Sequence, residues 1–415
     1  MKVLIAGAGI GGLTTALMLH KRGIKSRLFE RAKEVRELGV GINTLPHAIR
    51  ELAELDLLDR LDDVGVRTRE LRYITKQGQA VWTELRGTYA GHDIPQFSIH
   101  RGRLQKVLFD AVIERLGPDA VATGAQLAGF FQDEGGVTVQ FRDSIEGGPS
   151  RVERGEILIC SDGIHSAGRK AFYPNEGPPS WNGVAMWRGA VEWPIWEDGQ
   201  TMVIAGGMSG KLALYPISKP VDGKQLMNWV VAVRVADGEK TSPPENSWSK
   251  MVPLSTVLPH ARRFSVPGFD LEGLVRATPA VFEYPMADRD PLPRWTHGRI
   301  TLLGDAAHPM YPVGSNGASQ AILDARFLSD ALVSAPHPRE ALYRYDQERR
   351  PKTAEIVRLN RKGGPERVID EVEKLCPTTF NKIEDVMSHA QLEAIVKGYA
   401  GTAGYSVDQT GLKRV

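Results

Sequence analysis

One stretch, residues 299–324, combines a carboxylate, a loop of prolines and glycines, and the start of a helical pattern. Its apolar run ends at Gly304-Asp305, and the loop extends to Gly317. The carboxylate of Asp305 can accept hydrogen bonds from hydroxyl groups, whereas the first N–H groups of a helix favour negative charge. The stretch predicts a site for a polar, partly anionic ligand, although an ordinary strand–loop–helix connection carries the same turn residues.

A second set of residues with chemical potential opens the chain. After a short buried-strand pattern come Gly7, Gly9 and Gly12 of GAGIGG, and a helical stretch follows. Gly7 permits a tight turn, Gly9 lets the backbone approach a pyrophosphate, and Gly12 lets helix and strand pack closely. The next strand pattern ends at Glu30, near the spacing of about 20 residues at which a carboxylate binds ribose hydroxyls. Together these features predict a dinucleotide site.

Two further segments place polar residues at element ends. Asp162-Gly163 follows another buried-strand pattern. Residues 98–117 are predicted as a helix with Arg101 and Arg103 in its first turn. Positive charge is unfavourable at a helix N-terminus, so one of these arginines is expected to serve another group, such as a phosphate. The alternative is a solvated helix start.

Length and composition limit the class of protein. A chain of 415 residues predicts two or three domains, and 42% apolar with 25% charged residues is ordinary for a globular protein. A net charge of +2 gives no case for nucleic acid or an acidic membrane as partner. Cys160 and Cys376 are too few for a disulfide framework and lack metal-ligand spacing, which fits a reducing cytoplasm. The N-terminal apolar run passes directly into another strand pattern, which argues against a cleaved signal peptide, and no run approaches a membrane span of about 20 residues.

The order of patterns predicts an α/β fold with an inserted sheet. Strands and helices alternate early, including a helix over residues 46–61, whereas residues 181–234 are typical of a mostly antiparallel sheet. Five of the eight tryptophans lie in that sheet, where a core position is favoured over an aromatic site wall. The expected divisions are a Rossmann-like domain (1–70, 97–175 and 287–335), a substrate domain (71–96 and 176–286) and a C-terminal helical region (336–415).

Three motifs in this order carry a family resemblance: GAGIGG at 7–12, CSDGIHSAGR at 160–169 and GDAAHPMYPVGSNGASQAILD at 304–324. The trio resembles the single-component FAD-dependent aromatic hydroxylases of the para-hydroxybenzoate hydroxylase type. Shorter phrases, including LGVGIN (38–43) and MWRG (186–189), resemble the branch that modifies phenazines such as 5-methylphenazine-1-carboxylate. The resemblance covers about 360 residues, and the tail beyond Asn360 looks different.

The resemblance implies a fold, an activity and a set of partners. The fold would be an FAD-binding domain of the glutathione reductase type with an inserted β-sheet substrate domain. The activity would be hydroxylation of an aromatic or N-heteroaromatic small molecule with NAD(P)H and O2 through a flavin C4a-hydroperoxide. We expect a cytoplasmic monomer or homodimer that needs no metal, nucleic acid or membrane.

The resemblance also implies roles for individual residues. Glu30 would bind the adenosine ribose, and Asp305 the ribitol chain. The loop from Pro312 would place a helix N-terminus at the pyrimidine edge of the flavin, where the reduced ring carries negative charge. Arg188 and Tyr215 are candidates to meet a substrate carboxylate or hydroxyl. The expected cofactor-binding residues are Gly7, Gly9, Gly12, Glu30, Arg31, Gly41, Arg101, Asp162, Gly163, Gly304, Asp305, Gly314, Asn316 and Gly317.

Departures from the family pattern bear on the substrate. Leu214 stands where salicylate-type members carry a histidine that can deprotonate a phenol, which counts against salicylate or hydroxybenzoate. His308 is expected to be structural. Alternative readings are another flavin enzyme on this fold, namely an oxidase, reductase or halogenase, or a dinucleotide-binding protein without activity. The segment Trp193–Trp196 does not match the halogenase signature W-x-W-x-I-P.

Overall fold

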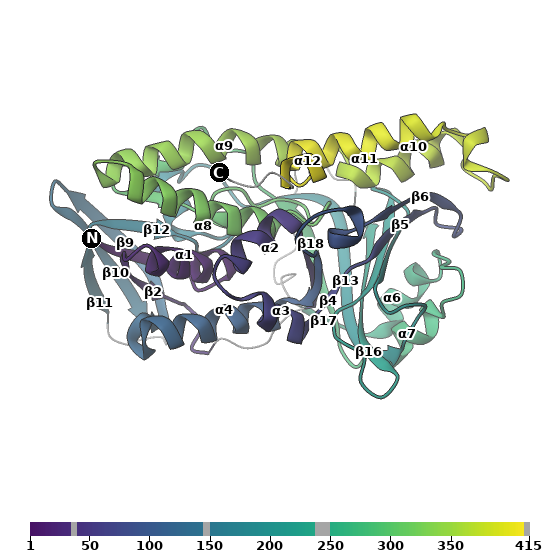
Figure 1. Ribbon diagram of the computed structural model, residues 1–415, viewed down its shortest axis with the longest axis horizontal. Coiled ribbons are helices and arrows are strands. Elements are labelled where there is room, and N and C mark those ends of the chain that lie inside the picture. The colour runs from purple at the N-terminus through teal and green to yellow at the C-terminus, as the bar shows by residue number, and fades with distance from the viewer. Residues whose placement is uncertain (35–39, 144–149, 237–249, 411–415) are drawn as a thin grey trace.

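The computed structural model describes residues 1–34, 40–143, 150–236 and 250–410, and a six-stranded sheet lies at one end of the elongated molecule (Figure 1). In spatial order its strands are β19 (Thr296–His297), β20 (Ile300–Leu302), β12 (Ile157–Cys160), β1 (Lys2–Ala6), β2 (Lys25–Phe29) and β8 (Val121–Ala122). Strands β20, β12 and β1 are adjacent and parallel. Because parallel strands end at the same edge of a sheet, the residues that follow them converge there: Gly7, Asp162 and Asp305.

A group of helices packs against this sheet. Helix α1 contacts α4 and α8, and α9 packs on α8 along one side of the molecule (Figure 1). Their bounds are α1 (Ile10–Lys21), α4 (Arg101–Leu116), α8 (Gly317–Ser334) and α9 (Pro338–Arg361), with α5 (Ala167–Phe172) after β12. Helix α9 continues through Pro351, which lies inside it.

Two expected helices differ from those observed. The helix expected over 98–117 begins only at Arg101, because residues 97–100 pair as a strand with β3. The helix expected over 46–61 is divided into α2 (Pro46–Ala53) and α3 (Leu58–Val64). Asp56, between them, has a left-handed φ of 57°, which a continuing right-handed helix does not contain.

Two three-stranded sheets complete the set of sheets in the described part of the chain. One consists of β11 (Arg151–Gly155), β10 (Gly136–Asp143) and β9 (Ala125–Asp133), and the other of β3 (Gly41–Thr44), β7 (Phe97–His100) and β4 (Gly65–Arg67). The expected turn between β9 and β10 is confirmed: the Asp133 carboxylate accepts hydrogen bonds from the N–H groups of Gly135 and Gly136. Strand β3 carries Gly41 toward the large sheet. Residues 38 and 39 of the LGVGIN phrase lie outside the described residues.

An eight-stranded sheet forms the other end of the molecule, and its two faces differ. It is antiparallel, as expected, except where β14 pairs in parallel with β5. One face packs on α6 and α7 around Trp187 and Trp229, which confirms the core interpretation for these two tryptophans. The other face looks toward the first sheet. In spatial order the strands are β17 (Lys250–Val252), β18 (Val281–Asp288), β13 (Ser180–Pro194), β16 (Lys224–Arg234), β15 (Gly210–Pro216), β14 (Thr201–Ala205), β5 (Glu70–Ile74) and β6 (Ala80–Leu85).

Helix α6 (Leu254–Ala261) follows β17 and precedes α7 (Leu271–Ala277). The chain end forms α10 (Arg367–Leu375), α11 (His389–Ala403) and α12 (Val407–Thr410). Helix α10 lies over β5 and β6, whereas α12 lies next to the end of α9 (Figure 1). Val368, Val372 and Val396 of this end share a buried cluster with the large sheet. None of the described helices has the length and apolar character needed to cross a membrane.

Candidate functional site

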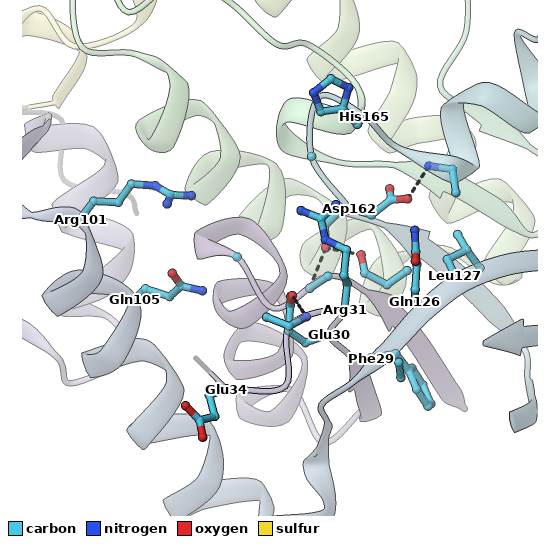
Figure 2. A pocket seen from close by; sticks show the side chains of 18 residues that line it. Phe29, Glu30, Arg31, Glu34, Arg101, Gln105, Gln126, Leu127, Asp162 and His165 are labelled. Carbon is cyan, nitrogen blue, oxygen red and sulfur yellow. Dashed lines mark hydrogen bonds between the residues drawn. The ribbon is translucent and has the colours of Figure 1, made fainter. Parts of the chain in front are cut away.

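A cavity of about 380 Å³ lies at the carboxyl ends of β1 and β12. Arg101 and Gln105 extend into it from α4, and Asp162 and His165 approach it from the segment after β12 (Figure 2). Of the expected cofactor residues, those that line it are Gly7, Gly9, Glu30, Arg31, Arg101, Asp162 and Gly163. Residues from four separate segments of the chain therefore meet at one place, as the fingerprint predicted.

The three fingerprint glycines differ in what a side chain would meet. At Gly7 and Gly12 it would clash with the protein, whereas at Gly9 it would enter open space. Gly7 has a φ of +102°, and a Cβ atom there would lie 2.4 Å from the carbonyl oxygen of Ser161. A Cβ on Gly12 would lie 2.1 Å from the carbonyl oxygen of Gly7, so this residue serves helix–strand packing and does not line the cavity. A Cβ on Gly9 would meet no protein atom within 4 Å. The protein's own packing thus leaves open space beside Gly9, at the wall of the cavity.

Two carboxylates in this cavity are held by backbone N–H groups. Glu30 accepts hydrogen bonds from Ala8 and Ala32, each at 2.8 Å, which ties the glycine loop to the end of β2 (Figure 2). Asp162 accepts one from Ala167 at 2.7 Å through Oδ2, whereas its buried Oδ1 has no hydrogen-bond partner among the described residues. Burial raises the pKa of Asp162. An acceptor without a partner in a cavity wall suits a ligand that presents hydroxyl donors.

A second cavity of about 350 Å³ continues from the first and separates the two large sheets. Gly9, Arg101, Ser161 and Gly163 line both cavities, so together they form one extended cleft. Further expected residues that line the second part are Gly41, Arg188, Tyr215, Gly304, Asp305, Pro312, Asn316 and Gly317. The residues of the 299–324 stretch therefore face the fingerprint across a common space.

The loop before α8 is held from behind by the C-terminal end of the chain. Asn316 donates through Nδ2 to the carbonyl oxygen of Gly314 and to the hydroxyl oxygen of Tyr399, both at 2.9 Å. Gly314 has a φ of +64°, and a Cβ there would lie 2.6 Å from the Tyr399 ring. Gly314 is thus a packing residue that does not line the cavity. The Asn316 Oδ1 atom accepts a hydrogen bond from the Gln320 side chain at 3.1 Å and not from a backbone N–H group of α8. No side chain in the described part of the chain therefore caps this helix, and its start at Gly317 faces the cavity.

A buried charged cluster supports the turn at Gly304. Asp324 accepts hydrogen bonds from the Gly304 N–H at 3.1 Å, from His308 Nε2 at 2.6 Å and from Arg349 Nε at 2.8 Å. Burial alone would raise the pKa of Asp324, but the neighbouring His308 and Arg349 hold it at about 2. His308 is buried and does not line the cavity. Its contacts are those of a structural residue, as expected.

Arg188 and Tyr215 reach the cavity but already share one acceptor. Arg188 Nη2 and the Tyr215 hydroxyl donate to the carbonyl oxygen of Gly41 at 2.7 and 2.8 Å. The Gly41 N–H donates to Asn228 Oδ1 at 2.7 Å. Burial raises the pKa of Tyr215, which keeps the hydroxyl protonated and able to donate. These side chains hold β3 at the cleft, and within the described ranges the buried Nε of Arg188 has no hydrogen-bond partner.

The expectation that position 214 faces the substrate site is wrong for this chain. Alternate residues of β15 face opposite sides of the sheet, and Ala213 and Tyr215 line the cavity. Leu214 is fully buried in the core against α6 and α7, so a side chain at this position does not reach the cleft. Among the described residues that line the second cavity there is nevertheless no histidine.

Sequence reasoning missed two charged residues of the cavity wall, Lys211 and Glu366. Their side chains form an ion pair with a Nζ–Oε2 distance of 2.7 Å. The alternation along β15 could have placed Lys211 on the same face as Ala213 and Tyr215. No sequence signal marks Glu366, which enters from the short turn η4 (Gly364–Glu366) after α9.

The cleft fits an extended dinucleotide. Its first part offers open backbone at Gly9 and an acceptor at Asp162 Oδ1, and its second part offers the Asp305 carboxylate and the start of α8. These groups suit a pyrophosphate, hydroxyls and a ring edge that becomes negative. The described residues contain no group of three or more histidine, cysteine or acidic side chains arranged to hold a metal ion. The fold and the cleft thus define a dinucleotide-binding protein of the flavoprotein type.

Comparison with known proteins establishes the family. The family model described as FAD binding domain matches residues 1–360, and this chain belongs to that family. Phenazine 1,6-dicarboxylic acid hydroxylase PhzS of Lysobacter antibioticus is 45% identical over 363 residues, covering 86% of this chain and 89% of the relative. Salicylate hydroxylase of Pseudomonas putida is 30% identical over 386 residues, covering 86% and 83%.

A solved structure with the same fold is HpxO of Klebsiella pneumoniae complexed with FAD and uric acid. It superimposes with a TM-score of 0.70 at 23% identity, over 97% of this chain and 92% of that chain. The expected fold, the FAD cofactor and the enzyme class, a flavin-dependent aromatic hydroxylase, are thereby confirmed. The roles of individual residues are proposals, which follow.

Proposed function

We propose that this chain hydroxylates a phenazine carboxylate or a closely related N-heteroaromatic acid. The relative PhzS, named for a phenazine dicarboxylic acid, supports the substrate class, and 5-methylphenazine-1-carboxylate falls within it. One observation in the structure carries the proposal. The second cavity is lined by apolar side chains and also by cationic ones, which suits an aromatic acid. In the balanced reaction, the substrate C–H, O2, NAD(P)H and a proton yield C–OH, water and NAD(P)⁺.

The residues of the cleft divide into those that hold FAD and those that face the substrate. Bound FAD supplies the redox chemistry, taking hydride from NAD(P)H and activating O2. Gly9 admits the pyrophosphate, Glu30 and Asp162 meet hydroxyls of the nucleotide half, and Asp305 meets the ribitol. The start of α8, which follows Pro312 to Asn316, stabilises negative charge on the ring edge. Arg31, Arg101 and Gly163, which line the first cavity, are proposed to contact the nucleotide as well.

The second cavity has an apolar surface on which a flat aromatic acid could lie. Met186, Met202, Ile204 and Val230 line it from the large sheet, and Tyr311 lines it from the loop before α8. These side chains exclude water from the reacting ring, which a flavin oxygenation requires. We propose that Arg188 and Tyr215 position the strand over the flavin through Gly41 and contribute to substrate orientation. No histidine is among the described residues that line this cavity. This favours a substrate that is hydroxylated without prior deprotonation of a phenol by a histidine.

The test is stopped-flow reduction of the flavin by NADH and by NADPH, with phenazine carboxylates, hydroxybenzoates and hydroxypyridines as a panel. A phenazine carboxylate should accelerate reduction more than the other classes and yield a product that contains one oxygen atom from O2. If no aromatic compound accelerates reduction and only hydrogen peroxide forms, an oxidase activity replaces the proposal. If a hydroxybenzoate is the best substrate, the substrate class is wrong.

We also propose the three-part division given by residues 1–70, 97–175 and 287–335 for the FAD domain, residues 71–96 and 176–286 for the substrate domain, and residues 336–415 for the C-terminal region. The buried cluster shared by the C-terminal helices and the large sheet supports a role for that region in the substrate site. Two free cysteines, Cys160 and Cys376, support a cytoplasmic location, where the enzyme would act as a monomer or homodimer.

A further inference from the structure

The ion pair between Lys211 and Glu366 is an unusual component of an apolar cavity wall. Lys211 is 7% and Glu366 3% exposed, and both line the second cavity. The free-energy cost of removing an ammonium and a carboxylate from water is often as large as the energy of their attraction, or larger. Replacing such a buried pair by apolar residues often leaves the stability of a protein unchanged or increases it. Stability alone therefore gives a weak reason for this pair.

The hydrogen bonds of Lys211 leave donor capacity toward the cavity. An ammonium group has three N–H donors. Lys211 Nζ donates to Glu366 Oε2 at 2.7 Å, and the described part of the chain provides no other hydrogen-bond acceptor for it. The neighbours on the same sheet face, Met202, Ile204 and Ala213, are apolar. A ligand in this space would thus find a fixed, incompletely satisfied cation.

The charges of the cavity favour an anion with one charge. Its ionisable wall residues are three cations, Arg101, Arg188 and Lys211, and two carboxylates, Asp305 and Glu366. Arg101 and Asp305 lie on the FAD side of the cleft and offset each other. Arg188, Lys211 and Glu366 remain on the substrate side with a net charge of one positive unit, which a single substrate carboxylate neutralises.

We propose that Lys211 binds the carboxylate of the substrate and thereby determines specificity for aromatic acids, and that Glu366 positions its ammonium. This inference rests on the proposed function and specifies how the substrate site selects its ligand. It also gives the C-terminal region a direct part in the site, because Glu366 lies 155 positions along the chain from Lys211.

A second ion pair provides a matched control. Lys76 Nζ lies 3.2 Å from Glu373 Oε2 and joins the same large sheet to α10. Lys76 does not line the cavity. A variant at Lys76 therefore removes a comparable link between the sheet and the C-terminal region without changing the charge of the substrate space.

The experiment measures the affinity of the FAD-loaded enzyme for phenazine-1-carboxylate and for its uncharged carboxamide by titration of the flavin absorbance. Wild-type enzyme should prefer the carboxylate. In Lys211→Met, carboxylate affinity should fall about 10- to 100-fold, as expected for a lost hydrogen bond to a charged group, and carboxamide affinity should change less than about threefold. Lys76→Met should leave both affinities within about threefold of wild type.

Two further variants separate recognition from structural damage. Glu366→Gln makes the substrate side more positive, so carboxylate affinity should increase about three- to tenfold with little change for the carboxamide. Lys211→Met leaves Glu366 buried without a cation, so the double variant with Glu366→Gln is measured beside it. The double variant should fold and still lose the preference for the carboxylate.

The inference fails if wild-type enzyme does not prefer the carboxylate, if Lys211→Met weakens both ligands equally, or if Lys76→Met reproduces the effect. It also fails if Glu366→Gln weakens carboxylate binding. Failure of the proposed function has a different signature: neither phenazine changes the flavin spectrum of wild-type enzyme, whereas another aromatic acid does. The same variants, titrated with that acid and its amide, then decide whether Lys211 is the recognition residue.

Discussion

The Tyr399 hydroxyl joins the C-terminal region to the loop that faces the flavin, and removing it tests this connection. Tyr399 is 4% exposed; its hydroxyl donates to Asn360 Oδ1 at 2.7 Å and accepts from Asn316 Nδ2 at 2.9 Å. In Tyr399→Phe, Asn360 Oδ1 loses a buried donor, whereas Asn316 keeps its hydrogen bond to Gly314. An unsatisfied buried group costs about 1–3 kcal/mol, so the two losses together should lower the free energy of unfolding by about 2–4 kcal/mol.

The assay is urea denaturation of the enzyme without FAD, together with an FAD titration. If the loop binds the flavin as proposed, loss of the Tyr399 hydroxyl that holds it should lower FAD affinity roughly tenfold, equivalent to about 1.4 kcal/mol. Tyr343→Phe on the exposed surface of α9 is the control and should stay within about 0.5 kcal/mol of wild type. Equal stability of Tyr399→Phe and Tyr343→Phe would refute the structural reasoning. Lost stability with unchanged FAD affinity would refute the link to the loop.

Two further predictions concern carboxylates within residues 299–324, namely Asp305 and Asp324. Asp305→Ala should weaken FAD binding about 10- to 100-fold, the effect of one lost hydrogen bond to a charged group, and full flavin occupancy after dialysis with normal turnover would contradict its role. The folded pKa of Asp324 is about 2, below its ordinary value of 3.8, so its ionised form stabilises the fold by about 2 kcal/mol above pH 4. This contribution is lost as the pH falls from about 4 to 2. The difference in unfolding free energy between wild type and Asp324→Asn should shrink over that range, and a constant difference would exclude this origin.

Local motifs were predictable because their chemistry is contained in contiguous segments. The fingerprint from Gly7 to Glu30 lies within one strand–helix–strand unit, so spacing alone predicts that its ends meet. The same holds for Asp305 and the start of α8. Parallel strands then bring these segments together at one sheet edge, and the α/β fold with an inserted sheet was predictable from the change of pattern.

Element boundaries and sheet faces were less predictable, because they depend on contacts between distant segments. Residues 97–100 have a sequence that fits a helix start, yet pairing with β3 makes them a strand. Leu214 and Tyr215 are adjacent in sequence but face opposite sides of β15, and only the packing of α6 and α7 determines which side is core. A sequence pattern with period two defines alternation without defining which face meets the ligand.

The sequence by itself determined the class of this protein, because the three motifs that resemble the family each carry their geometry within a short segment. The tertiary structure alone decided the composition of the substrate cavity. Lys211 meets Glu366, and Gly314 meets Tyr399, only after the C-terminal helices fold back over the large sheet and the loop. Such pairings depend on burial and charge across long separations, and no local spacing records them.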